Sequence, residues 1–242
     1  MRITIEGGVK TLVLKTGQPG NEIGGFVTSI EGWYGPPAPR ESPIESNGHD
    51  GDAWPSALTE GPRYLTFECY ERCVSSIEAG RILDLVAGLS CERLRVTVED
   101  ALGARSIEGF VSDDPTPRLY EDGCVVAYTL VLTCPYPNKK GDDVSYPVTG
   151  GQAIVRNGGN VASWPRVEVE GRVTALELSH DGHRVTWTGN ADGLSIDMFD
   201  MSCSSGSIGE DDAFSIAPGT SPVGVSITGS GTPYLVLADA WR

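Results

Sequence analysis

Apolar and polar residues alternate along much of the chain, which is the pattern of half-buried β-strands. The alternation is clearest over residues 63–71. One face there carries Leu65, Phe67, Cys69 and Glu71, and the other carries Tyr64, Thr66, Glu68 and Tyr70. In the first half of the chain, the same reasoning predicts further strands over residues 1–5, 9–14, 23–30, 94–99, 105–111 and 124–133.

The period changes after residue 73, where we predict the one confident α-helix of the chain, over residues 75–89. Ser75 and Glu78 have the spacing of a capping box, and Gly88 and Ser90 can end the helix. The apolar positions with helical spacing are Val74, Ile77, Leu85 and Leu89.

Residues 134–141 combine two prolines, a glycine and two lysines, and we place a domain boundary there, between domains 1–141 and 142–242. The second half reads as short strands only, with a hairpin signal at Asp181-Gly182. These strands are predicted over residues 144–148, 152–156, 165–171, 175–179, 184–188, 194–197, 214–216, 223–229 and 234–238. Short strands and turns at this spacing predict a β-sandwich.

A long irregular segment, residues 32–62, separates two of the predicted strands and is rich in proline, glycine and aromatic residues. Structureless connections longer than about 15 residues are uncommon in compact domains unless they have a function. Aromatic side chains on an extended Pro-rich segment can dock on a neighbouring surface at a low entropic cost. A loop folded back on its own domain explains the composition as well, so both interpretations stay open.

Composition narrows the class of protein. Gly and Pro make up 47 of 242 residues, roughly 19% against a usual value of about 12%, which favours turns and short strands. The net charge of −15 argues against a protein that grips nucleic acid by its phosphates. The opening residues MRITIEGG lack a secretory leader, and no apolar run approaches the ~20 residues of a membrane span, so we expect cytoplasmic synthesis and no membrane insertion. The six cysteines are then expected to be reduced thiols.

Candidate chemistry is sparse. Cys69 and Cys73 lack a second pair of thiols for zinc, and we interpret them as small buried hydrophobes. His180 and His183 flank a hairpin turn and are expected at an exposed tip. His49-Asp50 lacks a nucleophile in an activating sequence context.

Two further possibilities stay open. The acidic pairs at residues 113–114, 142–143 and 210–212 are expected in loops, where solvated charge is favoured over calcium or glycosidase carboxylates. The five tryptophans could stack on sugar rings, although Trp187 is expected in the core and Trp241 beside an apolar strand. We therefore predict a non-enzymatic assembly or binding protein with no cofactor and no metal.

The order of these signals resembles the distal tail protein (Dit) family of long-tailed, non-contractile bacteriophages. In the first half, residues 32–40 (GWYGPPAPR) and 47–51 (NGHDG) look like the long loop of that family, and residues 61–67 look like the entry into the next strand. Residues 134–137 look like the junction between its domains, although relatives often have Asp-Pro there and this chain has Tyr136. In the second half, residues 157–165, 194–197 and 214–220 are similar to the motifs of the galectin-like sandwich of the family.

The resemblance implies a small N-terminal β-barrel-like domain with one α-helix, followed by a galectin-like β-sandwich. It also implies a structural virion protein, a hexameric ring at the tail tip that joins the tail tube to the tail-tip hub, bears receptor-binding proteins and lets genomic DNA pass. The loop residues expected at a subunit boundary are Trp33, Tyr34, Pro36, Pro37, Arg40, His49, Asp50 and Trp54. The sandwich motif residues are Asn157, Gly159, Pro165, Asp197, Pro218 and Gly219. The alternatives are a baseplate adaptor of another stoichiometry, or a β-sandwich that binds cell-surface carbohydrate.

Overall fold

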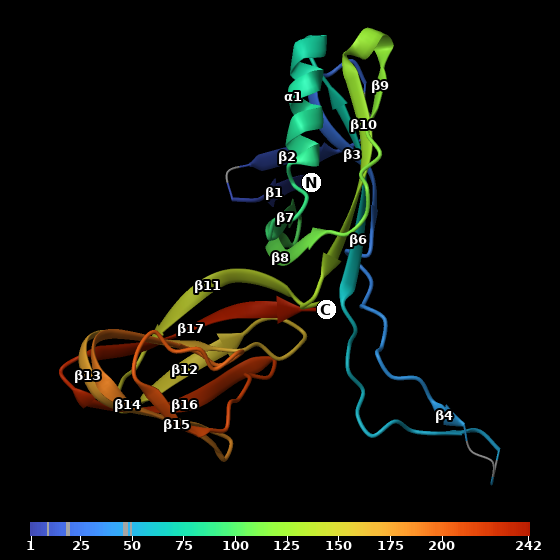
Figure 1. Ribbon diagram of the computed structural model, residues 1–242. Helices are drawn as coiled ribbons and strands as arrows, with labels where there is room; N and C mark the ends of the chain where they lie inside the picture. The colour runs from blue at the N-terminus through green and yellow to red at the C-terminus, as the bar shows by residue number, and fades with distance from the viewer. Residues whose placement is uncertain (9, 18–19, 46–47, 49) are drawn as a thin grey trace. The chain divides into compact units, whose positions relative to one another are not determined.

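The computed structural model describes residues 1–8, 10–17, 20–45, 48 and 50–242, and it is mainly β, as predicted (Figure 1). The chain divides into two compact units, residues 1–139 together with Arg242, and residues 140–241. Among the described residues no helix has both the length and the apolar character that crossing a bilayer requires.

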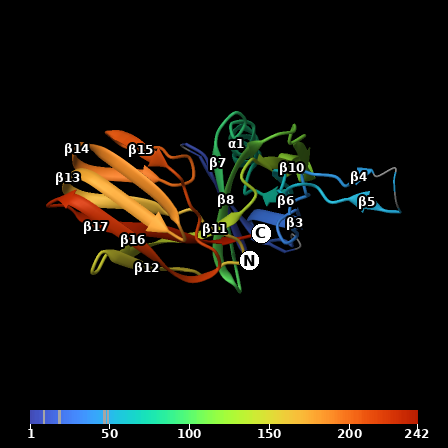
Figure 2. The same ribbon diagram turned by 90° about the horizontal axis from the view of Figure 1, so that it is seen from below.

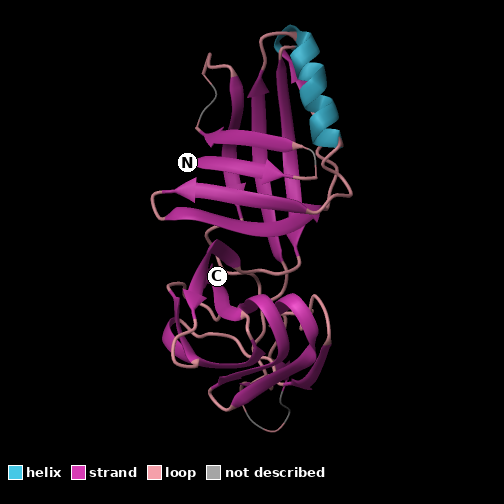
Figure 3. Cartoon of the chain, turned by 90° about the vertical axis from the view of Figure 1, so that its left-hand side faces the viewer, coloured by secondary structure: helices cyan, strands magenta, loops and turns pink. Residues whose placement is uncertain are grey.

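The first unit contains a closed β-barrel in which each strand is hydrogen-bonded to two neighbours, in the order β7-β1-β2-β3-β6-β10-β8 and back to β7. Figure 3 shows its strands in two crossed layers, with the helix alongside. Its strands are β1 (Arg2–Glu6), β2 (Thr11–Thr16), β3 (Gly24–Glu31), β6 (Arg63–Arg72), β7 (Leu94–Asp100), β8 (Gly103–Val111) and β10 (Val125–Cys134). The ring closes where β10 pairs with β8, through Leu132 with Val111 and Thr133 with Phe110. Strands β2 and β3 run parallel, and the other neighbours run antiparallel.

The alternation seen in the sequence fills the barrel. Leu65 and Phe67 of β6 point inward opposite Leu132 and Leu130 of β10, and all four side chains are buried. Burying one such side chain stabilises the fold by about 1.5–3 kcal/mol, so this ladder is a large part of the core. Cys69 is buried on the same face, as predicted.

The helix α1 (Ser76–Ala87) packs against β10 and β6 and is capped as the sequence indicates (Figure 1). The Ser75 hydroxyl accepts a hydrogen bond from the Glu78 backbone N–H, and the Glu78 carboxylate accepts one from the Val74 N–H at 2.7 Å. These bonds satisfy backbone donors at the start of the helix. At its end, the Lys10 ammonium donates to the Gly88 carbonyl at 2.8 Å.

The buried face of the helix agrees with the predicted one only in part: Leu89 is buried and Leu85 packs half-buried against the core, as predicted. Ala79 and Val86, seven residues apart, point into the core, whereas Val74 and Ile77 are exposed. Val74 precedes the N-cap, so its side chain does not follow the helical repeat. Ile77 lies off the stripe that Ala79 and Val86 define.

Short elements that the sequence pattern did not predict lie outside the barrel. They are β4 (Ile44–Glu45), β5 (Asp52–Ala53), β9 (Arg118–Tyr120), which pairs with β10, and the 3-10 helix η1 (Glu121–Gly123). Two or three residues are too few to show a period, which is why they escape a pattern-based prediction.

The second unit is a β-sandwich of two sheets that share their longest strands. Its strands are β11 (Lys139–Pro147), β12 (Gln152–Asn157), β13 (Arg166–His180), β14 (His183–Asp197), β15 (Ser207–Asp211), β16 (Gly219–Gly229) and β17 (Thr232–Trp241). β13 pairs with β17 over residues 166–170 and with β16 over residues 173–179. β14 pairs with β13 in both of these parts. Trp187 and Ile196 lie in the core between the sheets, and the prediction for Trp187 is confirmed.

The sequence pattern predicts two short strands in place of each of β13 and β14, because it is interrupted where these strands bend. The stretches 165–171 and 175–179 form one strand, and so do 184–188 and 194–197. Gly171 (φ 87°) and Gly193 (φ 97°) take left-handed backbone conformations at the bends, so the strands continue through bulges instead of ending. Residues 214–216, predicted as a strand, make only the isolated bridge between Ile216 and Ser163.

Two loop predictions also need correction. Asp142 and Asp143 lie in β11, and Glu210 and Asp211 in β15, so these acidic pairs are on strands. The predicted hairpin at Asp181-Gly182 is confirmed.

One buried carboxyl gives the barrel a pH-dependent stability. Glu71 is 6% exposed, and burial, opposed by a hydrogen bond from the Tyr128 hydroxyl at 3.3 Å, raises its pKa from 4.5 to about 7. The folded state therefore holds this proton more tightly than the unfolded state does. The stabilisation is complete below about pH 4.5 and is lost as the pH rises through 7.

We expect Glu71→Gln to remove this dependence. The variant gains stability relative to the natural chain between pH 4.5 and 8, by an amount on the order of 3 kcal/mol, because the amide cannot ionise. Urea unfolding at several pH values measures the difference. Glu68→Gln, on the outward face of the same strand, is the control, and equal pH profiles for both variants would contradict the assignment.

Candidate interaction surfaces

The irregular segment predicted from sequence forms an arm, which we define as residues 36–61. Its two sides are joined by hydrogen bonds from Arg40 N to Thr59 O and from Gly61 N to Ala38 O, both 2.9 Å, and farther out by the β4–β5 pair. Figures 1 and 2 show this ribbon stretching away from the ends of β3 and β6. His49 lies outside the described residues.

Large apolar side chains of the arm face solvent. Trp54 is 83% exposed, and Ile44 and Leu58 are also exposed. Pro36, Arg40 and Asp50 lie on the surface as well. Exposed apolar residues that lie together on one segment are a reason to expect contact with another protein surface. The role of the arm between subunits stays a prediction.

Trp33, at the root of the arm, differs from its neighbours on the loop. Its side chain is 2% exposed and belongs to the core of the barrel unit. It therefore anchors the loop within its own unit. Tyr34, the next residue, is exposed, and its hydroxyl donates to the Met1 sulfur at 3.2 Å.

Two buried cations hold the root of the arm. Arg63, 1% exposed, donates from Nη1 to the carbonyls of Gly32 and Gly35 and from Nε to the Pro137 carbonyl at 2.7 Å. Lys139 donates to the Trp33 carbonyl at 2.8 Å, and its ammonium lies 5.4 Å from the centre of the Trp33 ring. We call these contacts the root clamp.

The electrostatics of the root clamp are unusual for a pair of cations. Burial, together with the charges of Arg63 and Arg105, lowers the pKa of Lys139 to about 8. Burial also lowers the pKa of Arg63. The acceptors of these hydrogen bonds are backbone carbonyls, so directional hydrogen bonds compensate part of the desolvation. Glu60 near Arg63 and Asp100 near Lys139 add Coulombic support, while Nη2 of Arg63 is buried with no hydrogen-bond partner.

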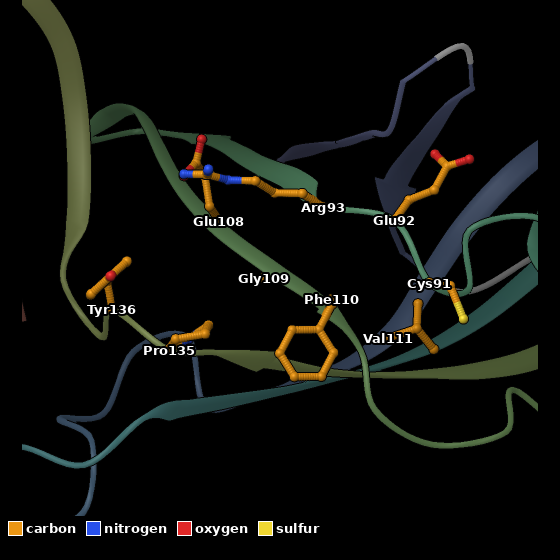
Figure 4. A pocket seen from close by; sticks show the side chains of 9 residues that line it. All are labelled: Cys91, Glu92, Arg93, Glu108, Gly109, Phe110, Val111, Pro135 and Tyr136. Carbon is orange, nitrogen blue, oxygen red and sulfur yellow. The ribbon is translucent and has the colours of Figure 1, made fainter. Parts of the chain in front are cut away.

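A groove of about 540 Å³ lies in the barrel unit, lined by residues 91–93, 108–111 and 135–136 (Figure 4). The rings of Phe110 and Tyr136 are partly exposed along it, and Arg93 forms an ion pair with Glu108. Its lining combines the Cys91 thiol, the charged Glu92, Arg93 and Glu108, and the two aromatic rings.

In the sandwich unit, the motif residue Asn157 is a buried structural bridge. Its side-chain amide donates to the carbonyls of Val161 (2.8 Å) and Ile216 (3.0 Å). Its Oδ1 accepts from the backbone N–H groups of Gly159 (3.0 Å) and Ala240 (3.4 Å). A Cβ at Gly159 would lie 1.8 Å from the Ala240 carbonyl oxygen, so only glycine fits there.

The remaining motif residues have related roles. Gly219 begins β16 opposite Asn157 and has φ 118°. The Pro165 carbonyl accepts from the Met198 N–H, and the Asp197 carboxylate accepts from the Phe199 N–H. Pro218 lies at an exposed bend. The structure thus gives most of these residues packing and turn roles, which bring the ends of four strands together.

His180 and His183 do not form a metal site with their described neighbours. His180 pairs with His183 across the hairpin, but His180 is buried against Phe214, with Nδ1 3.0 Å from the Pro222 carbonyl, so its predicted place at an exposed tip is wrong. His183 Nδ1 lies 3.0 Å from Asp212 Oδ1. The described residues contain no group of three or more His, Cys, Asp or Glu side chains that could hold a metal ion.

One exposed aromatic pair lies in the sandwich unit. Trp164 and Phe199 are half-exposed and pack edge to face with their ring centres 6.1 Å apart. An edge-to-face pair does not present the flat double platform that would stack on a sugar, although either ring alone offers one face.

Solved structures match the chain over nearly its whole length. The Dit protein of phage SPP1, described as a paradigm of the hub adsorption apparatus in phages that infect Gram-positive bacteria, has a TM-score of 0.70 at 14% identity, with 99% of each chain covered. A chain of the phage P2 baseplate in its activated conformation with Ca has a TM-score of 0.55 at 8% identity, covering 98% of this chain and 97% of that one. The same baseplate with Sr gives 0.53 at 7%, with 97% of each chain covered.

The chain therefore has the fold of these phage proteins, and the fold expected from the resemblance is confirmed. No protein-family model matches the chain, and no curated protein matches it in sequence.

Sequence reasoning missed the root clamp, although a signal was present. Arg63 occupies the inward register of β6, two residues before Leu65, where a charged side chain must find buried partners. Lys139 carried no such signal, because residues 134–141 showed no strand period.

We expect Arg63→Lys to loosen the arm. A lysine has one ammonium and cannot reach the Gly32, Gly35 and Pro137 carbonyls together, so the unfolding free energy should fall by about 2–3 kcal/mol. Limited proteolysis within residues 36–61 should quicken. Arg93→Lys, at an exposed ion pair, should change stability by less than about 1 kcal/mol; similar losses in both variants would refute the clamp.

Asn157→Asp tests the bridge in the sandwich unit. The carboxylate cannot donate to the Val161 and Ile216 carbonyls, and a buried charge is added, so a loss of at least about 3 kcal/mol is expected in urea unfolding. Gln152→Glu, an exposed amide on the same strand, is the matched control. A near-neutral Asn157→Asp would mean that the two hydrogen bonds donated by the amide contribute little.

Proposed function

We propose that this chain is a structural component of the tail tip of a long-tailed phage. In this proposal six copies form a ring that joins the distal end of the tail tube to the tail-tip hub, offers a docking platform and lets DNA pass. The observation that carries it is the likeness to the SPP1 Dit protein over 99% of both chains. A virion location, and receptor-binding proteins as further partners, belong to the same proposal.

The arm is proposed to cross to the neighbouring subunit. Its exposed Ile44, Trp54 and Leu58 lack a core of their own, while the root clamp fixes where the arm leaves the barrel. An arm that binds a different surface of the next copy makes a heterologous contact, and such contacts close into rings when the rotation between copies allows it.

The charge of the chain suits a DNA channel. Residues 1–139 carry 12 basic and 20 acidic residues, and residues 140–241 carry 5 and 13, so each part has a net charge of −8. Six copies carry −90 formal charges. Whichever part lines the lumen, we propose that its Asp and Glu side chains repel phosphate, which prevents adhesion of the passing genome.

A non-enzymatic role is part of the proposal. The groove and the two described histidines present contact surfaces and structural hydrogen bonds, and the arm carries the exposed Ile44, Trp54 and Leu58. The competing proposal is a baseplate adaptor with another stoichiometry. The fold match supports both, and the number of copies in the assembly distinguishes them.

Light scattering on the purified chain tests the ring. We expect a mass of about 154 kDa, six times the 25.7 kDa of one chain, and expect Trp54→Ala combined with Leu58→Ser to shift the population to monomers with an unchanged melting temperature. The physical reason is that both side chains are exposed in one copy and would be buried between two.

Leu102→Ser is the matched control, because Leu102 is equally exposed on the β7–β8 turn, away from the arm. Loss of the ring in the Leu102 variant as well would argue against the arm. A stable assembly other than a hexamer would favour the adaptor.

A further inference from the structure

Two cysteines continue the inward-facing ladder of the barrel. β6 and β10 pair so that Phe67 faces Leu130, Cys69 faces Tyr128 and Glu71 faces Val126. The paired register of the two strands ends with Arg72 opposite Val125. The next positions are Cys73 and Cys124, which by the same alternation belong to the inward face.

The backbone keeps these two residues together. The Cys73 N–H donates to the Cys124 carbonyl at 2.9 Å, while the Cys124 N–H turns away to the Glu121 carbonyl at 3.1 Å. Directly opposite, hydrogen-bonded residues in antiparallel strands have Cα atoms about 5.5 Å apart. That separation falls within the roughly 4.4–6.8 Å that a disulfide spans.

We propose that Cys73 and Cys124 are a dithiol pair that oxidises to a disulfide, stapling the end of β6 to the start of β10. Both are free thiols in the structure. The inference rests on the register of the barrel and is independent of the proposed ring.

The other thiols do not offer this geometry. Cys69 lies four residues from Cys73 along one strand, a separation of about 13 Å. Cys134 is at the opposite end of β10, and Cys203 is in the sandwich unit. Cys91 is exposed and follows the helix at φ 63°.

Exposure sets the order of the two chemical steps. Cys124 is partly exposed and Cys73 is buried. With a small-molecule disulfide as the oxidant, the Cys124 thiolate attacks one of its sulfurs, forms a mixed disulfide and releases one small thiol. Cys73 loses its proton, its thiolate attacks the Cys124 sulfur, and the second small thiol leaves. Two protein thiols are oxidised, and one small disulfide is reduced to two thiols.

The buried Cys73 thiol of the reduced pair resists loss of its proton. Burial, with the nearby Glu78 and Glu71, raises the pKa of Cys73, so its thiol form is favoured at neutral pH. Formation of the disulfide therefore needs both loss of the Cys73 proton and an oxidant.

The staple would enclose residues 73–124, which include α1, β7 and β8. Closing a loop of this length restricts the unfolded chain strongly, and the link fixes the strand ends beside which the helix begins. The expected result is a barrel unit that melts on the order of 10 °C higher when oxidised than when reduced.

The full chain incubated with glutathione disulfide tests the proposal. After alkylation of the remaining thiols and proteolysis, mass spectrometry should find a Cys73–Cys124 cross-link, and the count of free thiols should fall from six to four. A dithiol reductant should restore all six thiols and the lower melting temperature.

Cys124→Ser and Cys91→Ser are the paired variants. Cys124→Ser should keep its reduced-state stability and lose both the cross-link and the rise in melting temperature, while Cys91→Ser should keep both. A persistent glutathione adduct at Cys124, a cross-link between other cysteines, or six unreacted thiols after equilibration with excess oxidant would each overturn the proposal.

Discussion

The direction in which the exposed arm leaves the barrel depends on two buried positive charges. The arm has no core, so its direction is set where it leaves the barrel, and there Arg63 and Lys139 bind the carbonyls of the turn at residues 32–35. Carbonyl acceptors fix direction through hydrogen-bond geometry, which a diffuse ion pair would not do. Repulsion between the two cations is the cost of that placement, and the buried Trp33 ring beneath the Lys139 ammonium offsets part of it.

Closure of the barrel limits how copies of the chain could associate. A closed ring of strands leaves few free backbone donors and acceptors, so it offers little sheet edge to extend. In the proposed assembly, contacts would involve what lies outside the ring, such as the arm and the short strand β9, or side-chain grooves such as the one beside Phe110. In the sandwich unit, β13 and β14 bend and continue from one sheet into the other. The same strands therefore join its two layers.

The sequence was most informative where one force dominates. Alternation over residues 63–71 identified β6, because burial of one face decides the register. Ser75 with Glu78, and Asp181 with Gly182, located a helix start and a hairpin because each sets local backbone hydrogen bonds or dihedral angles. The continuity of β13 and β14 was missed, since a glycine ends a strand or bends it according to tertiary context. The root clamp was missed because its partners are backbone carbonyls, which no residue type reveals.

Charge and apolar exposure act in opposite directions in any assembly of this chain. Copies with a net charge of −15 repel one another, but beyond about 8–10 Å the repulsion is screened at ordinary salt concentrations. The apolar residues of the arm act only at contact, where burial of a residue such as Trp54 outweighs the screened repulsion. An acidic body with apolar side chains on a projecting arm therefore favours contacts that bury those side chains, because an approach between charged surfaces alone brings like charges together without that gain.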